Sequence, residues 1–158
     1  MQNIQVVCVG TLKERYWREA CQEYEKRLGA YCRLRVTELP EARLGGDREG
    51  EIRKVLQREG DAMLPLMEGA YNIALCIEGK QMDSPALAAR LAEVALQGGS
   101  RVNCLIGGSY GLDERVKQRS QLRLSVSPMT FPHQLFRVML LEQLYRAFSI
   151  NANGKYHK

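Results

Sequence analysis

The sequence predicts an α/β fold, in which a mainly parallel β-sheet carries helices on both of its faces. Short apolar runs that are typical of buried strands alternate along the chain with longer segments whose apolar residues recur at helical spacing. With 158 residues, 45% of them hydrophobic, the chain can bury one substantial core and has little room for a second. We therefore expect a single domain that spans residues 1–158.

The first half of the chain predicts two strands and two helices. Residues 4–9 are a buried strand, and residues 14–28 are a helix whose apolar face steps by four residues. Residues 32–39 alternate apolar and polar side chains, which indicates a strand with one wet face near the edge of the sheet. A loop over residues 40–47 then leads into a charged helix that ends near Met67.

The second half of the chain repeats this alternation and supplies the loops that could bind a ligand. Strands are predicted at residues 72–77, 102–106 and 122–126, and helices at residues 84–97, from residue 113, and at residues 134–150. Ser84 is expected to cap its helix, with Pro85 in the first turn. Ligands on parallel sheets bind beyond the carboxyl ends of the strands, so the candidate binding loops are residues 78–80, 107–111 and 127–132.

The net charge of +5 is unevenly distributed along the chain. Residues 1–100 contain 14 Lys and Arg against 15 Asp and Glu, whereas residues 101–158 contain 9 against 3. A one-sided basic region suits a polyanionic partner, because phosphate contacts by Lys and Arg supply most sequence-independent affinity for nucleic acids. An ordinary solvated basic surface explains the charge equally well.

The composition argues against a secreted, a membrane-spanning or a zinc-binding protein. No segment is long and apolar enough to predict a membrane span or a signal peptide, so we expect a soluble, cytoplasmic protein. The cysteines form no CxxC pair and only two histidines could add nitrogen ligands, so no metal site is expected. The cysteines are Cys8, Cys21, Cys32, Cys76 and Cys104, and the histidines are His133 and His157.

Two of the candidate loops carry unusual residues. Gly107, Gly108 and Gly111 allow a backbone to approach a ligand closely, although their spacing does not fit a dinucleotide-binding motif. Gly79-Lys80-Gln81 likewise lacks the glycines and the Ser or Thr of a P-loop. A nucleotide-like ligand and a plain tight turn are both compatible with them. Met129 and Phe131 stand where a loop is usually polar, and they could form a pocket wall or plug the core beneath the last helix.

The last helix and the tail contain a second group of polar residues. Glu142 and Arg146 are four residues apart and can pair on one helix face, although most such pairs are only surface salt bridges. Residues 155–158 bring a phenol, an imidazole and two ammonium groups to the end of the chain, where disorder is the common alternative to a functional role.

Together, these motifs resemble the bacterial large-subunit ribosomal RNA pseudouridine N3-methyltransferase family of the SPOUT superfamily. The resemblance extends over nearly the whole chain, and it rests on the order and spacing of the motifs rather than on any one of them. The motifs are Val9-Gly10, Leu75 with Gly79-Lys80, Ile106 to Leu112, Met129 to His133, Glu142 to Ala147, and Tyr156-His157-Lys158.

The resemblance implies a parallel-sheet SPOUT fold whose C-terminal part forms a deep trefoil knot, which the pattern of strands and helices alone does not predict. It also implies a homodimer, with the last helix near the interface and each active site completed by the partner chain. The implied cofactor is S-adenosyl-L-methionine. The residues that match the family's cofactor pocket are Leu75, Gly107, Val126, Ser127, Pro128, Met129, Thr130 and Phe131.

The reaction that the resemblance implies is methylation of N3 of a pseudouridine in the 23S ribosomal RNA of the large subunit, on the assembled ribosome. From the chemistry, we expect Arg146 and Lys158 to hold phosphate or to stabilise the developing imide anion. Tyr156 or His157 would lie close to the target base, stacking on it or relaying its proton. Glu142 would orient Arg146.

Two other functions are compatible with the sequence. A ribosome-associated binding module could keep the cofactor pocket without turnover, and a methyltransferase of the same fold could act on transfer RNA. Comparing ribosomes with bulk transfer RNA as methyl acceptors discriminates between the substrates, and tight ribosome binding without methyl transfer would favour the binding module.

Overall fold

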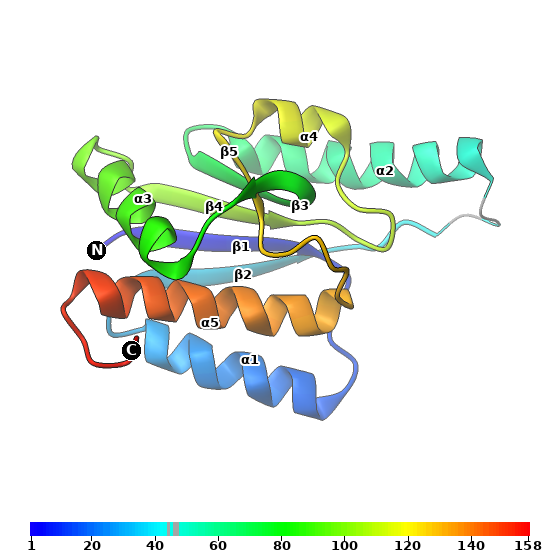
Figure 1. Cartoon of the computed structure of the whole chain (residues 1–158). Helices are drawn as coiled ribbons and strands as arrows, with labels where there is room; N and C mark the ends of the chain where they lie inside the picture. Colours follow the sequence, from blue (N-terminus) through cyan, green and yellow to red (C-terminus); the bar gives the residue numbers. More distant parts are fainter. Residues whose placement is uncertain (44, 46–47) are drawn as a thin grey trace.

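A computed structural model describes residues 1–43, 45 and 48–158 of the chain. In this part of the chain, five parallel strands form one sheet in the order β2-β1-β4-β3-β5 (Figure 1). The strands are β1 (Asn3–Val9), β2 (Arg33–Leu39), β3 (Tyr71–Gln81), β4 (Arg101–Ile106) and β5 (Leu122–Ser125). The predicted α/β fold is confirmed, and β2 lies at an edge of the sheet, as its alternating pattern predicted.

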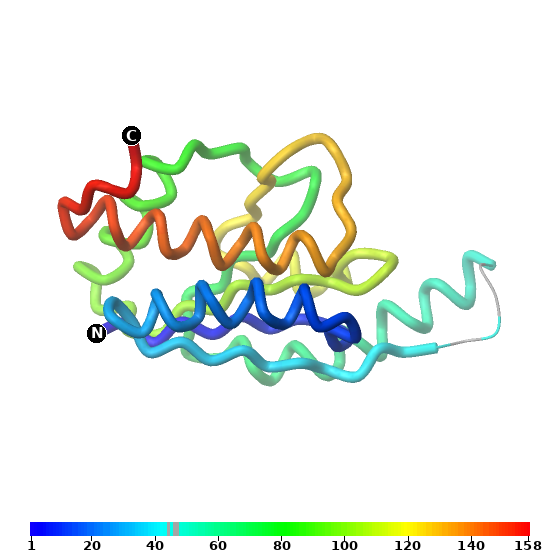
Figure 2. Tube along the Cα trace, turned by 90° about the horizontal axis from the view of Figure 1, so that it is seen from below, coloured from blue at the N-terminus to red at the C-terminus, as the bar shows by residue number. Residues whose placement is uncertain are grey.

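Helices cover both faces of the sheet (Figure 1). They are α1 (Arg15–Leu28), α2 (Glu49–Met63), α3 (Ser84–Leu96), α4 (Glu114–Arg119) and α5 (His133–Asn151), with a short 3-10 turn, η1 (Leu64–Met67), after α2. The helices α1, α3 and α5 pack on one face, whereas α2, η1 and α4 pack on the other. Figure 2 shows α1 and α5 side by side on the face of the sheet that is turned towards the viewer.

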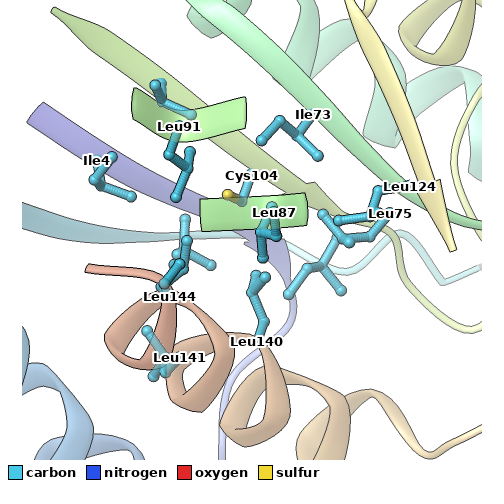
Figure 3. Packing of buried hydrophobic residues seen from close by; sticks show 14 of the residues in the cluster. Ile4, Ile73, Leu75, Leu87, Leu91, Cys104, Leu124, Leu140, Leu141 and Leu144 are labelled. Atoms are coloured by element: carbon cyan, nitrogen blue, oxygen red, sulfur yellow. The ribbon is translucent and has the colours of Figure 1, made fainter. Parts of the chain in front are cut away.

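The two layers of the core follow from the alternation of side chains along each strand. In β1, Ile4 and Val6 belong to the layer under α1, α3 and α5, whereas Val7 and Val9 belong to the layer under α2 and α4. Figure 3 shows the larger layer, in which leucines of α3 and α5 pack over the sheet. Because burying a leucine fully contributes about 1.5–3 kcal/mol, this layer is the main source of stability.

β3 differs from the prediction at residues 78–80. The sequence predicts a turn there, but the strand continues as extended chain with an irregularity after Leu75. Leu75 and Lys80 both oppose Leu124, so the residues between them bulge out of the ladder. A Cβ atom on Gly79 would lie 2.7 Å from the backbone of β5, which only glycine tolerates. The prediction was wrong because β5, a strand distant in sequence, pairs with the chain on both sides of the bulge.

The cap of α3 also differs from the prediction. Asp83, rather than Ser84, caps this helix, because its carboxylate accepts the Ala86 amide N–H at 2.8 Å. The Ser84 hydroxyl instead donates to Gln143 Oε1 at 2.7 Å, and this bond joins α3 to α5. Of the loop predicted at residues 40–47, positions 44, 46 and 47 lie outside the described residues.

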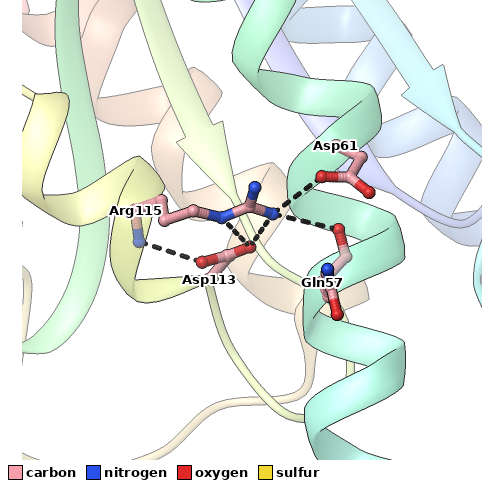
Figure 4. A network of polar contacts seen from close by, with 4 residues as sticks. All are labelled: Gln57, Asp61, Asp113 and Arg115. Atoms are coloured by element: carbon pink, nitrogen blue, oxygen red, sulfur yellow. Dashed lines mark hydrogen bonds and ion pairs between the residues drawn. The ribbon is translucent and has the colours of Figure 1, made fainter.

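A polar network joins α4 to α2 (Figure 4). The Arg115 guanidinium donates to Asp113 at 2.6 Å, to Asp61 at 2.8 Å and to the Gln57 carbonyl at 3.2 Å. Gly60 permits this close approach, since a Cβ atom on it would collide with the Asp113 carboxylate. The arginine and Asp61 are largely exposed, so solvent screens the charges and the network sets the helix position more than it adds stability.

The last residues of the chain, 152–158, fold back beside the end of α5 (Figure 1). Their contacts with the helix belong to the polar cluster described below. None of the described helices is long and apolar enough to cross a membrane.

Candidate active site

A pocket of about 580 Å³ opens at the carboxyl ends of β3, β4 and β5. The predicted loops at residues 107–111 and 127–132 meet there, together with the bulge of β3 after Leu75. This is the edge of a parallel sheet where ligands usually bind. Of the eight predicted cofactor residues, Pro128 is not among those that line the pocket, and the other seven line it. Those seven are Leu75, Gly107, Val126, Ser127, Met129, Thr130 and Phe131.

The glycine turn between β4 and α4 is closed tightly on itself. Gly108 and Gly111 form an isolated β-bridge, and Gly111 has a φ angle of 86°, which favours glycine. A Cβ atom on Gly107 would collide with the Gly111 carbonyl. The segment is therefore a tight turn and also part of a pocket wall. A ligand in the pocket would contact its backbone groups.

The loop after β5 forms the opposite wall of the pocket. The Met129 side chain is 74% exposed, so it does not plug the core, which was one of the two predicted alternatives. The Ser127 hydroxyl accepts the Met129 N–H at 2.9 Å, while the Ser127 carbonyl accepts the Ser125 hydroxyl at 3.1 Å. These bonds shape the loop, and Phe131 at its end also lines the pocket.

The pocket contains an ion pair that the sequence did not reveal. Lys117 of α4 lies 2.5 Å from Glu78 in the β3 bulge, and both side chains line the pocket. The hydrogen bond from Lys117 lowers the pKa of the Glu78 carboxyl, which is therefore ionised at neutral pH. Sequence reasoning missed the pair because its members come from two elements that only the fold brings together.

Arg137 fastens the start of α5 to the sheet beside this pocket. Its side chain is only 4% exposed, and its guanidinium donates to Glu38 at 2.7 Å and to the Gly10 carbonyl at 3.2 Å. A charge this deeply buried needs such partners. One helical turn earlier, His133 lines the pocket, so Arg137 also sets the position of that wall.

A second polar cluster lies along the second half of α5 and the tail, and it combines four of the five predicted catalytic residues. The Glu142 Oε1 atom accepts bonds from Arg146 Nε at 3.0 Å, Arg146 Nη2 at 2.6 Å and the Tyr156 hydroxyl at 3.1 Å. The Arg146 guanidinium lies 4.6 Å from the centre of the Tyr156 ring. His157 Nδ1 lies 3.2 Å from Arg146 Nη1, whereas Lys158 is exposed and outside these contacts.

The protonation of this cluster follows from its contacts. Burial, and then the hydrogen bond to Glu142, raises the pKa of the Tyr156 phenol, so the phenol stays protonated at neutral pH. The bonds to Glu142 raise the pKa of Arg146. Because an arginine can only donate, His157 Nδ1 must accept, and the neutral ring then carries its proton on Nε2.

The pocket lies beside the first turns of α5, whereas the cluster extends from the middle of the helix, at Glu142, to Arg146 and the tail. His133 starts the helix beside the pocket, and Arg146 comes 13 residues later, which corresponds to about 20 Å at 1.5 Å per residue. Figure 1 shows the same separation: α5 begins near the end of β5 and runs back to the tail at the other end of the sheet. None of the four cluster residues lines the pocket, although Glu142 follows Phe136 of the pocket wall by six residues, or about 9 Å along the helix.

A buried glutamate lies directly behind the glycine turn. Glu59 of α2 is only 5% exposed, and its Oε2 atom accepts the Ala42 N–H at 3.2 Å. Its Oε1 atom has no hydrogen-bond partner among the described residues. A Cβ atom on Gly108 would lie 3.1 Å from that oxygen. Burial, together with the charge of Glu41, raises the pKa of the Glu59 carboxyl.

The variant Glu59→Gln is expected to be more stable than wild type at pH 8, by about 1 kcal/mol, because it removes a partly unpaired buried charge. The folded state holds the Glu59 proton more tightly than the unfolded chain does. Wild type therefore loses stability as pH rises from about 4.5 through the raised pKa, and the glutamine variant does not.

Urea unfolding between pH 4.5 and pH 8 checks this prediction. The stability gain should shrink towards the acid end of the range. The exposed neighbour Glu41, changed to glutamine, is the control and should show little gain at any pH. A gain from Glu59→Gln that stays constant with pH would mean that the carboxyl does not carry the effect.

The chain is similar over its whole length to a known family of methyltransferases. The family model described as "Predicted SPOUT methyltransferase" matches residues 2–157. The chain belongs to the SPOUT methyltransferase family. Two solved methylase family proteins share its fold at 11% sequence identity. The one from Haemophilus influenzae Rd KW20 has a TM-score of 0.59 and covers 99% of this chain and 71% of its own. The one from Neisseria gonorrhoeae has a TM-score of 0.52, with 91% and 82% covered.

Three relatives of similar length are each named "Ribosomal RNA large subunit methyltransferase H". The protein of Bifidobacterium animalis subsp. lactis (strain AD011) is 48% identical over 99% of both chains. That of Bifidobacterium adolescentis is 45% identical over 98% of this chain and 99% of its own, and that of Clostridium novyi (strain NT) is 44% identical over 99% of both. Within the SPOUT family, the chain groups with these large-subunit methyltransferases.

Proposed function

We propose that this protein uses S-adenosyl-L-methionine to methylate N3 of a pseudouridine in the 23S ribosomal RNA, on the assembled ribosome. The observation that carries the proposal is the full-length similarity, at 44–48% identity, to proteins named as ribosomal RNA large subunit methyltransferases. With ribosomes as its substrate, the protein would act in the cytoplasm.

The pocket suits the cofactor in size and in chemistry. Ligand pockets usually enclose roughly 300–1,000 Å³, and this one has about 580 Å³. Leu75, Val126 and Met129 offer apolar walls, and the backbone of the glycine turn and of residues 127–131 offers N–H and carbonyl groups to a base edge. Pro128 has no N–H, so only its carbonyl or its ring could contribute. When bound, S-adenosyl-L-methionine would supply a methyl group that is attached to a good leaving group.

We propose that two copies of the chain build each active site. The rise of about 20 Å along α5 from His133 to Arg146 supports this, since a base that reacts beside His133 would not reach Arg146 of the same chain. Val126 and Met129 are exposed apolar residues. A groove of about 520 Å³, which Val126 also lines, contains Glu142 and apolar residues of α5 such as Val138 and Met139. A second copy seated there would bring its polar cluster towards the pocket.

The polar cluster would act on the imide that loses its proton. Methylation of N3 requires the imide proton to leave, to water, and negative charge then develops on the imide. S-adenosyl-L-methionine in the pocket would supply the methyl group and would be left as the neutral thioether. Arg146 and the Nε2–H of His157 offer donors to that charge. Glu142 holds Arg146 in place through two hydrogen bonds. Tyr156, protonated and bound to Glu142, is suited to stacking rather than to accepting the proton, and Lys158 is free to hold phosphate.

We propose further that the whole chain is one SPOUT domain with a C-terminal trefoil knot. β5 leads from α4 on one face of the sheet to α5 on the other, and it passes the β3 bulge on the way. Pulling the unfolded chain by its two ends tests the knot. A knotted chain would fall short of the full contour length of about 3.3–3.6 Å per residue, and an unknotted chain would reach it.

Transfer of a labelled methyl group to purified ribosomes tests the function. We expect transfer to ribosomes whose target uridines have been isomerised to pseudouridine, and none to ribosomes that lack the isomerisation. Bulk transfer RNA serves as the competing acceptor. Label on transfer RNA alone would identify a different substrate, and ribosome binding without any transfer would favour a binding module.

A further inference from the structure

Three arginines lie together on the part of the sheet that α2 and η1 leave uncovered. Arg33 of β2 and Arg101 of β4 are both paired with Asn3 of β1, so the three residues form a row across the sheet. Arg35 lies two residues further along β2, beside Gln5. We call Arg33, Arg35 and Arg101 the arginine patch. Its members flank a shallow hollow of about 410 Å³ that Asn3 and Gln5 also line.

The arginine patch is free to bind an external anion. All three arginines are exposed. In the part of the chain that the structure describes, none of their guanidinium groups forms an ion pair with a carboxylate. Strand geometry puts Arg33 and Arg35 about 7 Å apart along β2, and Arg33 and Arg101 about 10 Å apart across two strand spacings. Self-repulsion among three such cations is relieved by an anion between them.

Protection of a sheet edge does not explain this arrangement. Charged side chains on edge strands discourage pairing with other chains, and β2 is an edge strand, so Arg33 and Arg35 could serve that purpose. Arg101, however, is on β4, which lies inside the sheet between β1 and β3. A guanidinium presents a planar fork that matches phosphate, and the side-chain amide of Asn3 adds a further donor between the arginines. Gln5 Nε2 donates one of its two N–H groups to the Thr37 hydroxyl at 2.7 Å.

The arginine patch lies at the same end of the sheet as the polar cluster. β2 begins two residues after Tyr31, whose ring stacks on Phe148 of α5 at 6.3 Å. Tyr31 also contacts Tyr145 at 6.0 Å, and Tyr145 contacts Tyr156 of the cluster at 4.8 Å. An RNA whose target base reaches the cluster therefore has the arginine patch close by, around the end of the sheet.

We infer that the arginine patch binds the phosphate backbone of the ribosomal RNA that flanks the target nucleotide. This inference rests on the proposed function, because it takes ribosomal RNA as the substrate. The patch contributes affinity and positioning, since phosphate contacts hold a protein in register without reading the sequence.

The test compares the triple variant Arg33→Gln/Arg35→Gln/Arg101→Gln with wild type. The matched control is Arg53→Gln/Lys54→Gln/Arg58→Gln, three exposed cations of α2 whose loss changes the net charge equally. Binding to purified ribosomes is measured over a range of KCl concentrations, and methyl transfer is measured at saturating ribosomes. For the patch variant, affinity should fall about tenfold or more, and the slope of log K against log salt should weaken by about 2, at roughly 0.7 for each lost phosphate contact.

The remaining outcomes are distinct. Transfer at saturating ribosomes should be unchanged in the patch variant, since its pocket and polar cluster are intact, and the α2 control should bind like wild type. The inference that the patch binds RNA would be overturned if the patch variant kept the affinity and salt slope of wild type. An equal loss of affinity in the α2 control would overturn it as well. If wild type binds ribosomes but transfers no methyl group, the proposed function fails. The binding comparison would still show whether the arginine patch contacts ribosomal RNA. If wild type does not bind ribosomes, both are overturned.

Discussion

Replacing Arg146 by alanine is expected to lower methyl transfer by about two to three orders of magnitude at saturating ribosomes and cofactor. The side chain is held by two bonds to Glu142 and lies over the Tyr156 ring, so it is a fixed, permanently charged donor. Fixed donors lower the energy of a transition state that develops negative charge, because they need no reorganisation as the charge appears. Affinity for S-adenosyl-L-methionine should be unchanged, because Arg146 does not line the pocket.

The measurement is single-turnover transfer of a labelled methyl group, with calorimetry for cofactor binding. Arg90→Ala is the matched control: Arg90 is also a partly buried helix arginine with a carboxylate partner, Glu93, and a tyrosine partner, Tyr71, but it is on α3. It should keep nearly the wild-type rate. Nearly wild-type transfer by Arg146→Ala would remove this residue from the reaction.

Mixing two inactive variants is expected to restore about a quarter of the wild-type activity, if a two-fold symmetric dimer forms. One variant is Arg146→Ala, with a defective cluster and an intact pocket. The other is Gly107→Ala, whose added Cβ would collide with the Gly111 carbonyl and distort the pocket. After subunit exchange, half of the dimers contain one copy of each, and one of the two sites in such a dimer combines an intact pocket with an intact cluster.

The mixture is compared with each variant alone after the same unfolding and refolding treatment. If every active site lay within one chain, the mixture would show only the residual activity of its components. Thr130→Trp, which would fill the pocket mouth from an exposed position, replaces Gly107→Ala if that variant does not fold. The sedimentation coefficient of the wild-type protein provides an independent measure of dimer formation.

Local patterns predicted most of the fold because the spacing of apolar residues within each strand and helix indicates which of its faces is buried. The alternation at residues 32–39 indicated an edge strand, and β2 is one. The apolar helix after the loop at residues 127–132 is α5. The failure at residues 78–80 has the opposite cause. Glu78, Gly79 and Lys80 have the composition of a turn, but β3 pairs with β5 before them at Leu75 and again at Lys80 and Gln81, and no local pattern contains that partner.

The predicted site divides in the same way. Motif resemblance indicated seven of the residues that line the pocket and four that form the polar cluster, since residue types and spacing are properties of the sequence. Pro128 does not line the pocket, and Lys158 lies outside the cluster. It did not indicate the pairing of Glu78 with Lys117 or the unpaired oxygen of Glu59, because both depend on contacts between distant elements.

The sequence by itself determined the α/β class, the order of strands and helices, and the family. These follow from hydrophobic periodicity and from motif order, which are written along the chain. Only the tertiary structure decided that the pocket lies beside the start of α5, that the tail returns to Glu142 and Arg146, and that Arg101 joins Arg33 and Arg35 on one face. Distances in space depend on strand order, register and helix direction, and these are settled by packing between segments that are far apart in the sequence.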